Sequence, residues 1–160
     1  MENYLIHIDI EKLMHTANGP MKLTVKTEIG SGELVALFGP SGAGKTTLLR
    51  ILSGLTDPDK GVVKFGDTVW YDSEKRINLP PQQRNIGFMF QDYALFPNMT
   101  VEENILFAQT VKDAKAASEL ISIFGLNELR KRKPSKLSGG QKQRVALARA
   151  LARKQQLLLL

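Results

Sequence analysis

The chain has 160 residues, with 22 basic and 16 acidic side chains and a formal net charge of +6. It contains no cysteine, which excludes a disulfide scaffold, a thiol nucleophile and a cysteine-ligated metal. The length is that of one domain, and we expect neither a membrane span nor a secretory signal, because no apolar run approaches about 18 residues and the first residues are not basic.

The first segments have the alternation of half-buried strands. Apolar and polar residues alternate from Tyr4 to Ile10 and again from Met21 to Lys26, with turn-forming residues at 16–20 between them. Because each segment has one polar face, the pair is predicted to form an antiparallel hairpin.

A continuous apolar run follows at Leu34–Phe38 and predicts a strand that is buried on both faces. After a glycine-rich stretch, apolar residues at helical spacing from Leu48 to Leu55 predict an amphipathic helix. Shorter strands are expected at 62–65 and 86–90. From residue 100 the pattern is helical, with capping boxes predicted at Thr100–Glu103 and Ser138–Gln141.

The glycine-rich stretch matches the phosphate-loop pattern G-x4-G-K-[ST]. Its residues are Gly39, Pro40, Ser41, Gly42, Ala43, Gly44, Lys45 and Thr46. Small residues let successive N–H groups face a phosphate, and the following helix adds its positive end. Lys45 is then the cation for the β- and γ-phosphates, the Thr46 hydroxyl a ligand for Mg²⁺, and Thr47 a further phosphate contact.

A second motif, Leu137-Ser138-Gly139-Gly140-Gln141, begins the last predicted helix. As a plain helix start, Ser138 caps the helix and Gln141 closes the box. The motif followed by a basic helix also resembles the signature of ABC-type ATPases. The resemblance implies that Ser138, Gly139, Gly140 and Gln141 bind the ATP held by a second subunit, in a head-to-tail homodimer.

Gln91, directly after the predicted strand at 86–90, resembles the Q-loop glutamine of the same family. This implies that Gln91 reaches Mg²⁺ and the attacking water, and that residues 91–97 meet a transmembrane permease. Tyr93, Leu95 and Phe96 suit a docking groove for a partner helix, and core packing is the alternative for the same three side chains.

The resemblance covers essentially the whole chain and implies a partial ABC-type nucleotide-binding domain. Its expected class is the α/β P-loop NTPase fold, with an N-terminal antiparallel β region and a helical insert. Residues 1–98 form the core with the phosphate loop and Q-loop, 99–137 the helical subdomain, and 138–160 the signature helix and the start of the Walker B strand.

Two departures from the family are visible. The family stacks adenine on an aromatic residue about 30 positions before the loop lysine, but residues 13–16 contain none, so Met14 or His15 is the candidate to cover the base. The apolar run Leu157–Leu160 matches the start of Walker B, and the acids and the switch histidine that follow in the family are absent from the 160 residues. We therefore expect a fragment that binds ATP and hydrolyses it negligibly.

Residues 72–86, with Asp72-Ser73-Glu74-Lys75 and Ile77-Asn78-Leu79-Pro80-Pro81, are similar to the ATP-binding subunit of molybdate importers, and related stretches occur in sulfate, iron and polyamine importers. The implied function is the ATP-binding, energy-coupling subunit of an importer, at the cytoplasmic face of the membrane. The alternatives are another importer substrate, an ABC ATPase acting on ribosomes or DNA, and a binding module that does not turn over.

The positive charge lies mainly in residues 130–154, which hold ten basic side chains and no acidic one. This segment lacks the interleaved aromatic residues of single-strand nucleic-acid sites. We therefore predict no nucleic-acid partner and interpret Lys142, Arg149 and Arg153 as a solvated face of the signature helix.

Overall fold

The computed structural model describes residues 5–16, 19–153 and 155–160. The chain divides between Arg84 and Asn85 into two units, each described by itself below. Across the described residues, no helix has the length and apolar character to cross a membrane.

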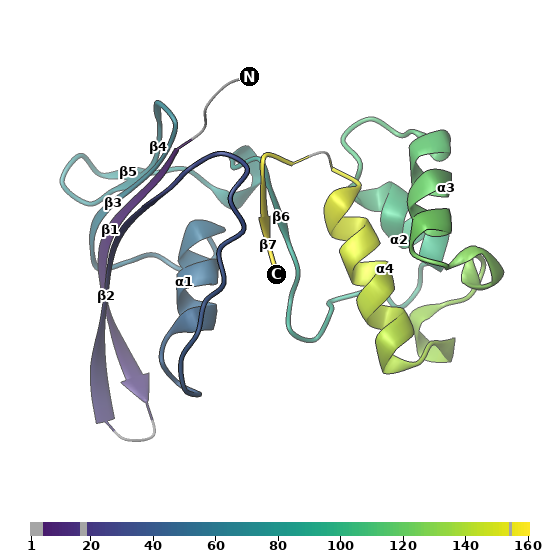
Figure 1. Cartoon of the computed structure of the whole chain (residues 1–160), viewed down its shortest axis with the longest axis horizontal. Coiled ribbons are helices and arrows are strands. Elements are labelled where there is room, and N and C mark those ends of the chain that lie inside the picture. Colours follow the sequence, from purple (N-terminus) through teal and green to yellow (C-terminus); the bar gives the residue numbers. More distant parts are fainter. Residues whose placement is uncertain (1–4, 17–18, 154) are drawn as a thin grey trace. The chain divides into compact units, whose positions relative to one another are not determined.

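The first unit is built on a five-stranded antiparallel sheet (Figure 1). Its strands are β1 (Ile6–Thr16), β2 (Gly19–Ile29), β3 (Lys60–Phe65), β4 (Thr68–Asp72) and β5 (Ile77–Asn78), in the order β2-β1-β3-β4-β5. The predicted hairpin is confirmed by β1 and β2, which pair from Ile6↔Ile29 to Thr16↔Gly19. Tyr4 and residues 17–18 of the predicted hairpin lie outside the described residues.

The core of this unit follows from the alternation along β1. Ile6, Ile8 and Ile10 are buried, and so are Val63 of β3 and Trp70 of β4. Helix α1 (Lys45–Leu52) buries its apolar stripe, Leu48, Ile51 and Leu52. The predicted helix after the phosphate loop is thus confirmed, although it ends before Leu55.

A buried arginine joins α1 to the sheet. The Arg84 side chain is 1% exposed, and its guanidinium lies 5.6 Å from the centroid of the Trp70 ring. Its hydrogen bonds go to Ile51 O (2.7 Å), Leu52 O (2.9 Å), Leu79 O (2.9 Å), Trp70 O (3.3 Å) and Asn78 Oδ1 (3.4 Å). Arg84 therefore caps the C-terminus of α1 by donating to its last carbonyls, and it also binds β4 and β5.

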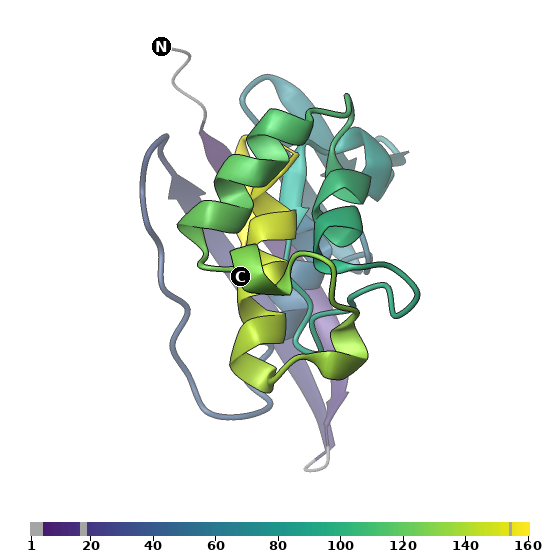
Figure 2. The same cartoon turned by 90° about the vertical axis from the view of Figure 1, so that its right-hand side faces the viewer.

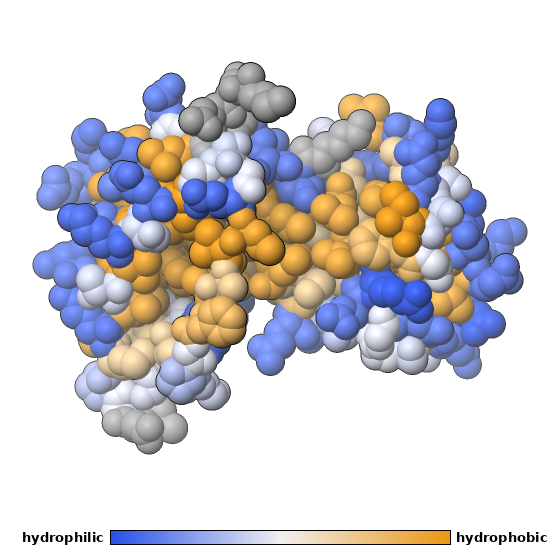
Figure 3. All heavy atoms as spheres, in the orientation of Figure 1, coloured by the Kyte–Doolittle hydropathy of each residue, from blue (hydrophilic) through white to orange (hydrophobic). Residues whose placement is uncertain are grey.

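The predicted buried strand at Leu34–Phe38 is wrong. In the structure this segment has no strand pairing and is part of the long connection between β2 and α1 (Figure 1). Leu34 is 100% and Phe38 93% exposed. An apolar run becomes a strand only where neighbouring strands pair with its backbone, and none of the described strands pairs with this one. Apolar side chains are accordingly visible on the surface of this unit (Figure 3).

The second unit combines a short parallel sheet with three helices. Strand β6 (Ile86–Phe88) pairs with β7 (Leu157–Leu159). The prediction for 86–90 is confirmed for its first three residues. The helices are α2 (Val101–Ala108), α3 (Ala114–Ile123) and α4 (Gly139–Leu151), with 3-10 turns at Asn127–Leu129 and Pro134–Lys136 (Figure 2).

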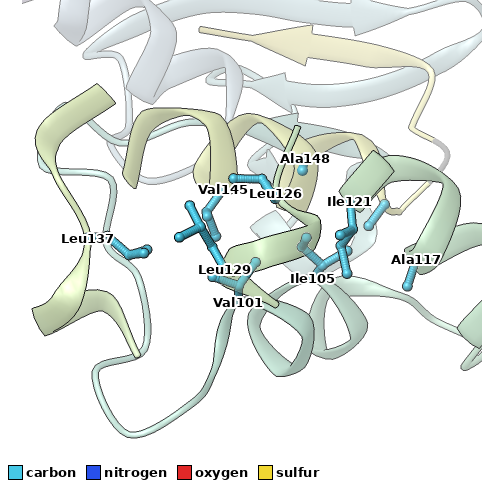
Figure 4. Packing of buried hydrophobic residues seen from close by; sticks show 10 residues of the cluster. Val101, Ile105, Ala117, Ile121, Leu126, Leu129, Leu137, Val145 and Ala148 are labelled. Carbon is cyan, nitrogen blue, oxygen red and sulfur yellow. The ribbon is translucent and has the colours of Figure 1, made fainter. Parts of the chain in front are cut away.

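The three helices enclose a hydrophobic cluster. Val101, Ile105, Ile121 and Val145 are each 0% exposed and lie close together (Figure 4). Both predicted capping boxes are confirmed. The Thr100 and Ser138 hydroxyls accept hydrogen bonds from the backbone amides of Glu103 and Gln141, and the side chains of Glu103 and Gln141 accept from the backbone amides of Thr100 and Ser138. The local sequence therefore sets where α2 and α4 begin.

Arg84→Met is expected to lower the free energy of unfolding by about 3 kcal/mol, because several buried carbonyls lose their donor and methionine supplies none. The measurement is urea denaturation followed by the fluorescence of Trp70. Arg50→Met is the matched control, since Arg50 is exposed on α1 and donates a hydrogen bond to Thr56 Oγ1 (3.2 Å). Equal losses for the two variants would contradict the role given to Arg84.

Candidate phosphate and signature sites

The loop at residues 39–44 has the backbone of a phosphate cradle. Gly39, Gly42 and Gly44 have φ of 156°, 83° and 88°, values that L-residues with a Cβ rarely adopt. At Gly44 an added Cβ would also lie 3.0 Å from Met14 Cε and 3.1 Å from Leu23 Cδ1. The hairpin β1–β2 therefore packs directly on the loop, whose backbone conformation at residue 44 requires glycine.

The lysine of the motif folds over this loop. Lys45 Nζ donates to Gly39 O (2.7 Å) and Pro40 O (2.8 Å), so its ammonium group lies within the turn. Helix α1 begins at Lys45, and no side chain caps its N-terminus. Uncapped N–H groups, a positive helix end and a lysine at one loop form an anion site, and these features fit a triphosphate.

The remaining predicted residues of the loop have different environments. Ser41 and Thr46 are exposed, whereas Ala43 and Thr47 are half-buried. The exposed Thr46 hydroxyl, in the first turn of α1, can ligate a metal ion beside a bound phosphate. Among the described residues there is no group of three or more Asp, Glu or His side chains that could hold a metal by itself.

The two candidates for covering adenine lie on opposite faces of β1. Met14 shares the face of Ile10 and reaches the loop at Gly44, whereas His15 is exposed. Only Met14 therefore lies next to the phosphate loop, where its flexible thioether chain provides an apolar surface.

The signature motif begins α4 with its backbone uncovered. Ser138, Gly139 and Gly140 are exposed, and Gln141 Oε1 accepts a hydrogen bond from the Ser138 amide (2.9 Å). Neither glycine has a positive φ, and a Cβ built on either would meet no atom within 4 Å. The fold of this chain therefore does not require glycine at these two positions.

Gln91 is exposed in a turn beyond β6. Gly87 allows β6 to lie close to α4, because a Cβ at this position would lie only 2.7 Å from Ala150 O. After Gln91 the chain turns with φ of 65° at Tyr93 and 41° at Ala94. In the segment that follows, Leu95 packs against the helical cluster, as the core-packing alternative predicts, whereas Phe96 is 37% exposed and contacts the ring of Phe107.

The interpretation of Arg149 as a solvated charge is wrong. Its Nη1 and Nη2 donate to Ala94 O and Tyr93 O, each at 2.7 Å, and burial lowers the pKa of its guanidinium, which remains charged at neutral pH. The helical spacing of Val145, Ala148 and Ala152, all buried, could have indicated this, because Arg149 lies on the same face. Arg144 also has a partner, Phe124 O at 3.0 Å.

The predicted residues thus form two groups. The first unit holds residues 39–47 with Met14, and the second holds Gln91 and residues 138–141. Sequence reasoning assigned no role to Arg84, which binds the last carbonyls of α1, and missed that Arg149 of α4 binds the turn after Gln91.

Comparisons with known proteins agree with these motifs. The molybdenum import ATP-binding protein ModC of Shewanella sp. (strain MR-7) is 42% identical over 156 residues, which cover 98% of this chain and 42% of that protein. The sulfate/thiosulfate import ATP-binding protein CysA 1 of Rhizobium meliloti (strain 1021) is 49% identical over 151 residues, 88% of this chain and 42% of the relative. The trehalose/maltose import ATP-binding protein MalK of Thermococcus litoralis is 42% identical over 159 residues, 96% and 42% respectively.

The chain spans about two fifths of the length of these curated relatives. Among solved structures, a dimeric bacterial ABC transporter cassette is similar with a TM-score of 0.79 and 30% identity, covering 96% of this chain and 72% of that one. A dimeric post-hydrolysis ATP-binding cassette with bound ADP and Pi has a TM-score of 0.78 at the same identity and coverage. The model of the ABC transporter family matches residues 23–160, so this chain, with its α/β phosphate-loop fold, belongs to that family of ATPases.

Proposed function

We propose that this chain is the ATP-binding, energy-coupling part of an ABC importer subunit. The observation that carries the proposal is the phosphate loop, where three glycines, an uncapped helix start and Lys45 meet at one turn. The three relatives described above are all named as import ATP-binding proteins. An importer is therefore favoured over an ABC ATPase that acts on ribosomes or DNA, and over a binding module without turnover.

In this proposal the chain's own residues bind and orient ATP. Loop amides and the N-terminus of α1 hold the phosphates, and Lys45 exchanges its bonds with Gly39 O and Pro40 O for the β- and γ-phosphates. Met14 covers the adenine. Thr46 would ligate Mg²⁺, which would neutralise charge on the phosphates. Hydrolysis in the whole protein resets the subunit.

Lys45→Ala is expected to weaken ATP binding at least about 100-fold, because the loop loses its only side-chain cation. Isothermal titration with Mg²⁺·ATP measures the affinity. Lys64→Ala, an exposed lysine on β3, is the control and should bind as the unchanged chain does. Unchanged affinity in Lys45→Ala, with its thermal midpoint also unchanged, would refute ATP binding at this loop.

The two signature glycines support a nucleotide-dependent homodimer. Because neither conformation nor internal space requires glycine at 139 or 140, the bare backbone suits the close approach of a group from outside the chain. We propose that this group is the ATP on the phosphate loop of a second copy, arranged head to tail. Exposed amides at the start of α4 provide the donors.

Gly140→Ala is expected to leave folding stability unchanged or slightly raised, because alanine favours helix. The same variant should lose ATP-dependent dimerisation, since the methyl group separates the backbone from the phosphate. Sedimentation velocity with Mg²⁺·ATP measures the dimer, and Gln143→Ala, exposed on the same helix, is the control. A Gly140→Ala chain that dimerises normally would contradict the proposed contact.

A permease and an oxyanion complete the proposal. The turn at 91–97 presents Phe96 on the surface, where an apolar partner helix can dock. We propose that the partner is a transmembrane permease, which places the subunit at the cytoplasmic face of the membrane. The similarity of residues 72–86 to molybdate importers favours molybdate or a related oxyanion over maltose.

Loss of the gene is expected to lower molybdate uptake by cells at least about tenfold at limiting concentration, and uptake should return with the unchanged gene and not with Lys45→Ala. Elemental analysis of washed cells measures molybdenum, and sulfate uptake serves as the parallel control. Normal molybdate uptake with impaired sulfate or maltose uptake would reassign the substrate and leave the importer role intact.

A further inference from the structure

The turn after Gln91 adopts a conformation that its own residues disfavour. Tyr93 and Ala94 both have a left-handed backbone, with φ of 65° and 41°, and neither is glycine. Two successive L-residues in this region persist only where surrounding groups hold them. The question is therefore which groups hold this turn.

Arg149 of α4 holds the strained pair directly. Its two terminal nitrogens donate to the carbonyls of Ala94 and Tyr93, each at 2.7 Å, and its Cζ lies 5.6 Å from the ring centroid of Phe96. A planar guanidinium presents two N–H groups at fixed spacing, which a lysine ammonium does not. One side chain thus fixes two successive carbonyls and the aromatic residue that follows them.

A second helix holds the other end of the segment. The buried Asn104 of α2 accepts a bond from the Phe96 amide (2.9 Å), and its own amide donates to Phe96 O (3.2 Å) and Met99 O (3.2 Å). These bonds begin at Phe96 and do not reach Tyr93 or Ala94. The side-chain donor to the carbonyls of the left-handed pair therefore comes from α4, whereas Phe96 is contacted from both helices.

Helix α4 carries the signature at its opposite end. From Gly140 to Arg149 the helix rises about 14 Å at about 1.5 Å per residue. It is held within the unit by buried residues at Val145, Ala146 and Ala148. Because both ends belong to one continuous helix, a shift of α4 along its axis would displace the guanidinium of Arg149 together with Gly140.

We propose that Arg149 is a positioning residue that makes the turn at 93–96 respond to nucleotide at the start of α4. The inference rests on the proposed function, since it assumes that ATP reaches Gly140 and that the turn meets the membrane partner. Arg149 touches neither. It transmits, through two carbonyl bonds, a displacement of the signature helix to the surface that presents Phe96.

Amide hydrogen exchange in the whole chain tests the link. The Tyr93 amide bonds to Phe90 O, the Phe96 amide to Asn104, and the Gln141 amide to Ser138 Oγ, so all three are protected reporters. Mg²⁺·ATP is expected to change the exchange rate at Gln141, Tyr93 and Phe96 by at least about threefold in the unchanged chain. In R149M only Gln141 should respond.

The variants also distinguish the two-carbonyl hydrogen bonding of Arg149 from the effect of its positive charge alone. Without nucleotide, R149M and R149K should each raise exchange at Tyr93 at least about tenfold, because methionine donates no hydrogen bond and lysine lacks the rigid, planar pair of nitrogens that a guanidinium presents. R144M is the matched control: Arg144 lies on the same helix and bonds Phe124 O, and its loss should leave Tyr93 unchanged. R149K that protects Tyr93 as well as arginine does would overturn the proposal.

The remaining outcomes are decisive in the unchanged chain, where folding is not in question. A response at Gln141 without one at Tyr93 and Phe96 overturns the role of Arg149 and leaves the proposed function standing. No response at any of the three amides overturns both this inference and the proposed nucleotide contact at Gly140, whereas ATP binding at the phosphate loop is tested separately by titration. If Mg²⁺·ATP changes exchange at Tyr93 and Phe96 in R149M as much as in the unchanged chain, other contacts move the turn and the proposal is overturned.

Discussion

The packing of the first unit depends on the guanidinium of Arg84, whose buried charge is neutralised by main-chain carbonyls at the end of α1 and in β4. The last carbonyls of a helix carry partial negative charge, so they are natural acceptors for a buried cation. The guanidinium also restricts residue 54, just beyond the helix, to glycine. Gly54 has φ of 75°, and a Cβ there would lie 2.9 Å from Arg84 Cζ. Helix α1 starts at the phosphate loop. The bonds of Arg84 to the C-terminal end of α1 therefore help to set the position of that loop.

The second unit uses the same physical solution. Arg149 is partly buried and Asn104 fully buried, and both bind main-chain groups of one segment. The arginine binds these carbonyls in place of an oppositely charged partner. A carboxylate would satisfy an arginine equally well, but it would add a charge that must be desolvated and would fix only itself. Carbonyl acceptors let one side chain fix the path of the backbone. In each unit, therefore, an arginine determines the shape of a segment that lies next to a functional motif.

The sequence predicted best those features that depend on neighbouring residues. The β1–β2 hairpin and both capping boxes need only alternation or a Ser/Thr three residues before Glu or Gln, and all are present. The phosphate loop was recognisable because its glycines are spaced by local geometry. Leu34–Phe38 failed for the opposite reason, since an apolar run specifies burial only when strands far along the chain lie beside it. Arg149 was misread because its charge was weighed and its position on the buried face of α4 was not.

At Gly139 and Gly140 the requirements of folding stability differ from those of the proposed nucleotide contact. Most functional positions are also constrained by packing, so that selection for stability protects them indirectly. These two are not, since alanine would fit the space, suit the helix and leave the capping box intact. A library screened for thermal stability or expression alone would accept alanine at both positions, and consensus-style stabilisation of this chain would thereby favour variants in which the proposed contact is blocked.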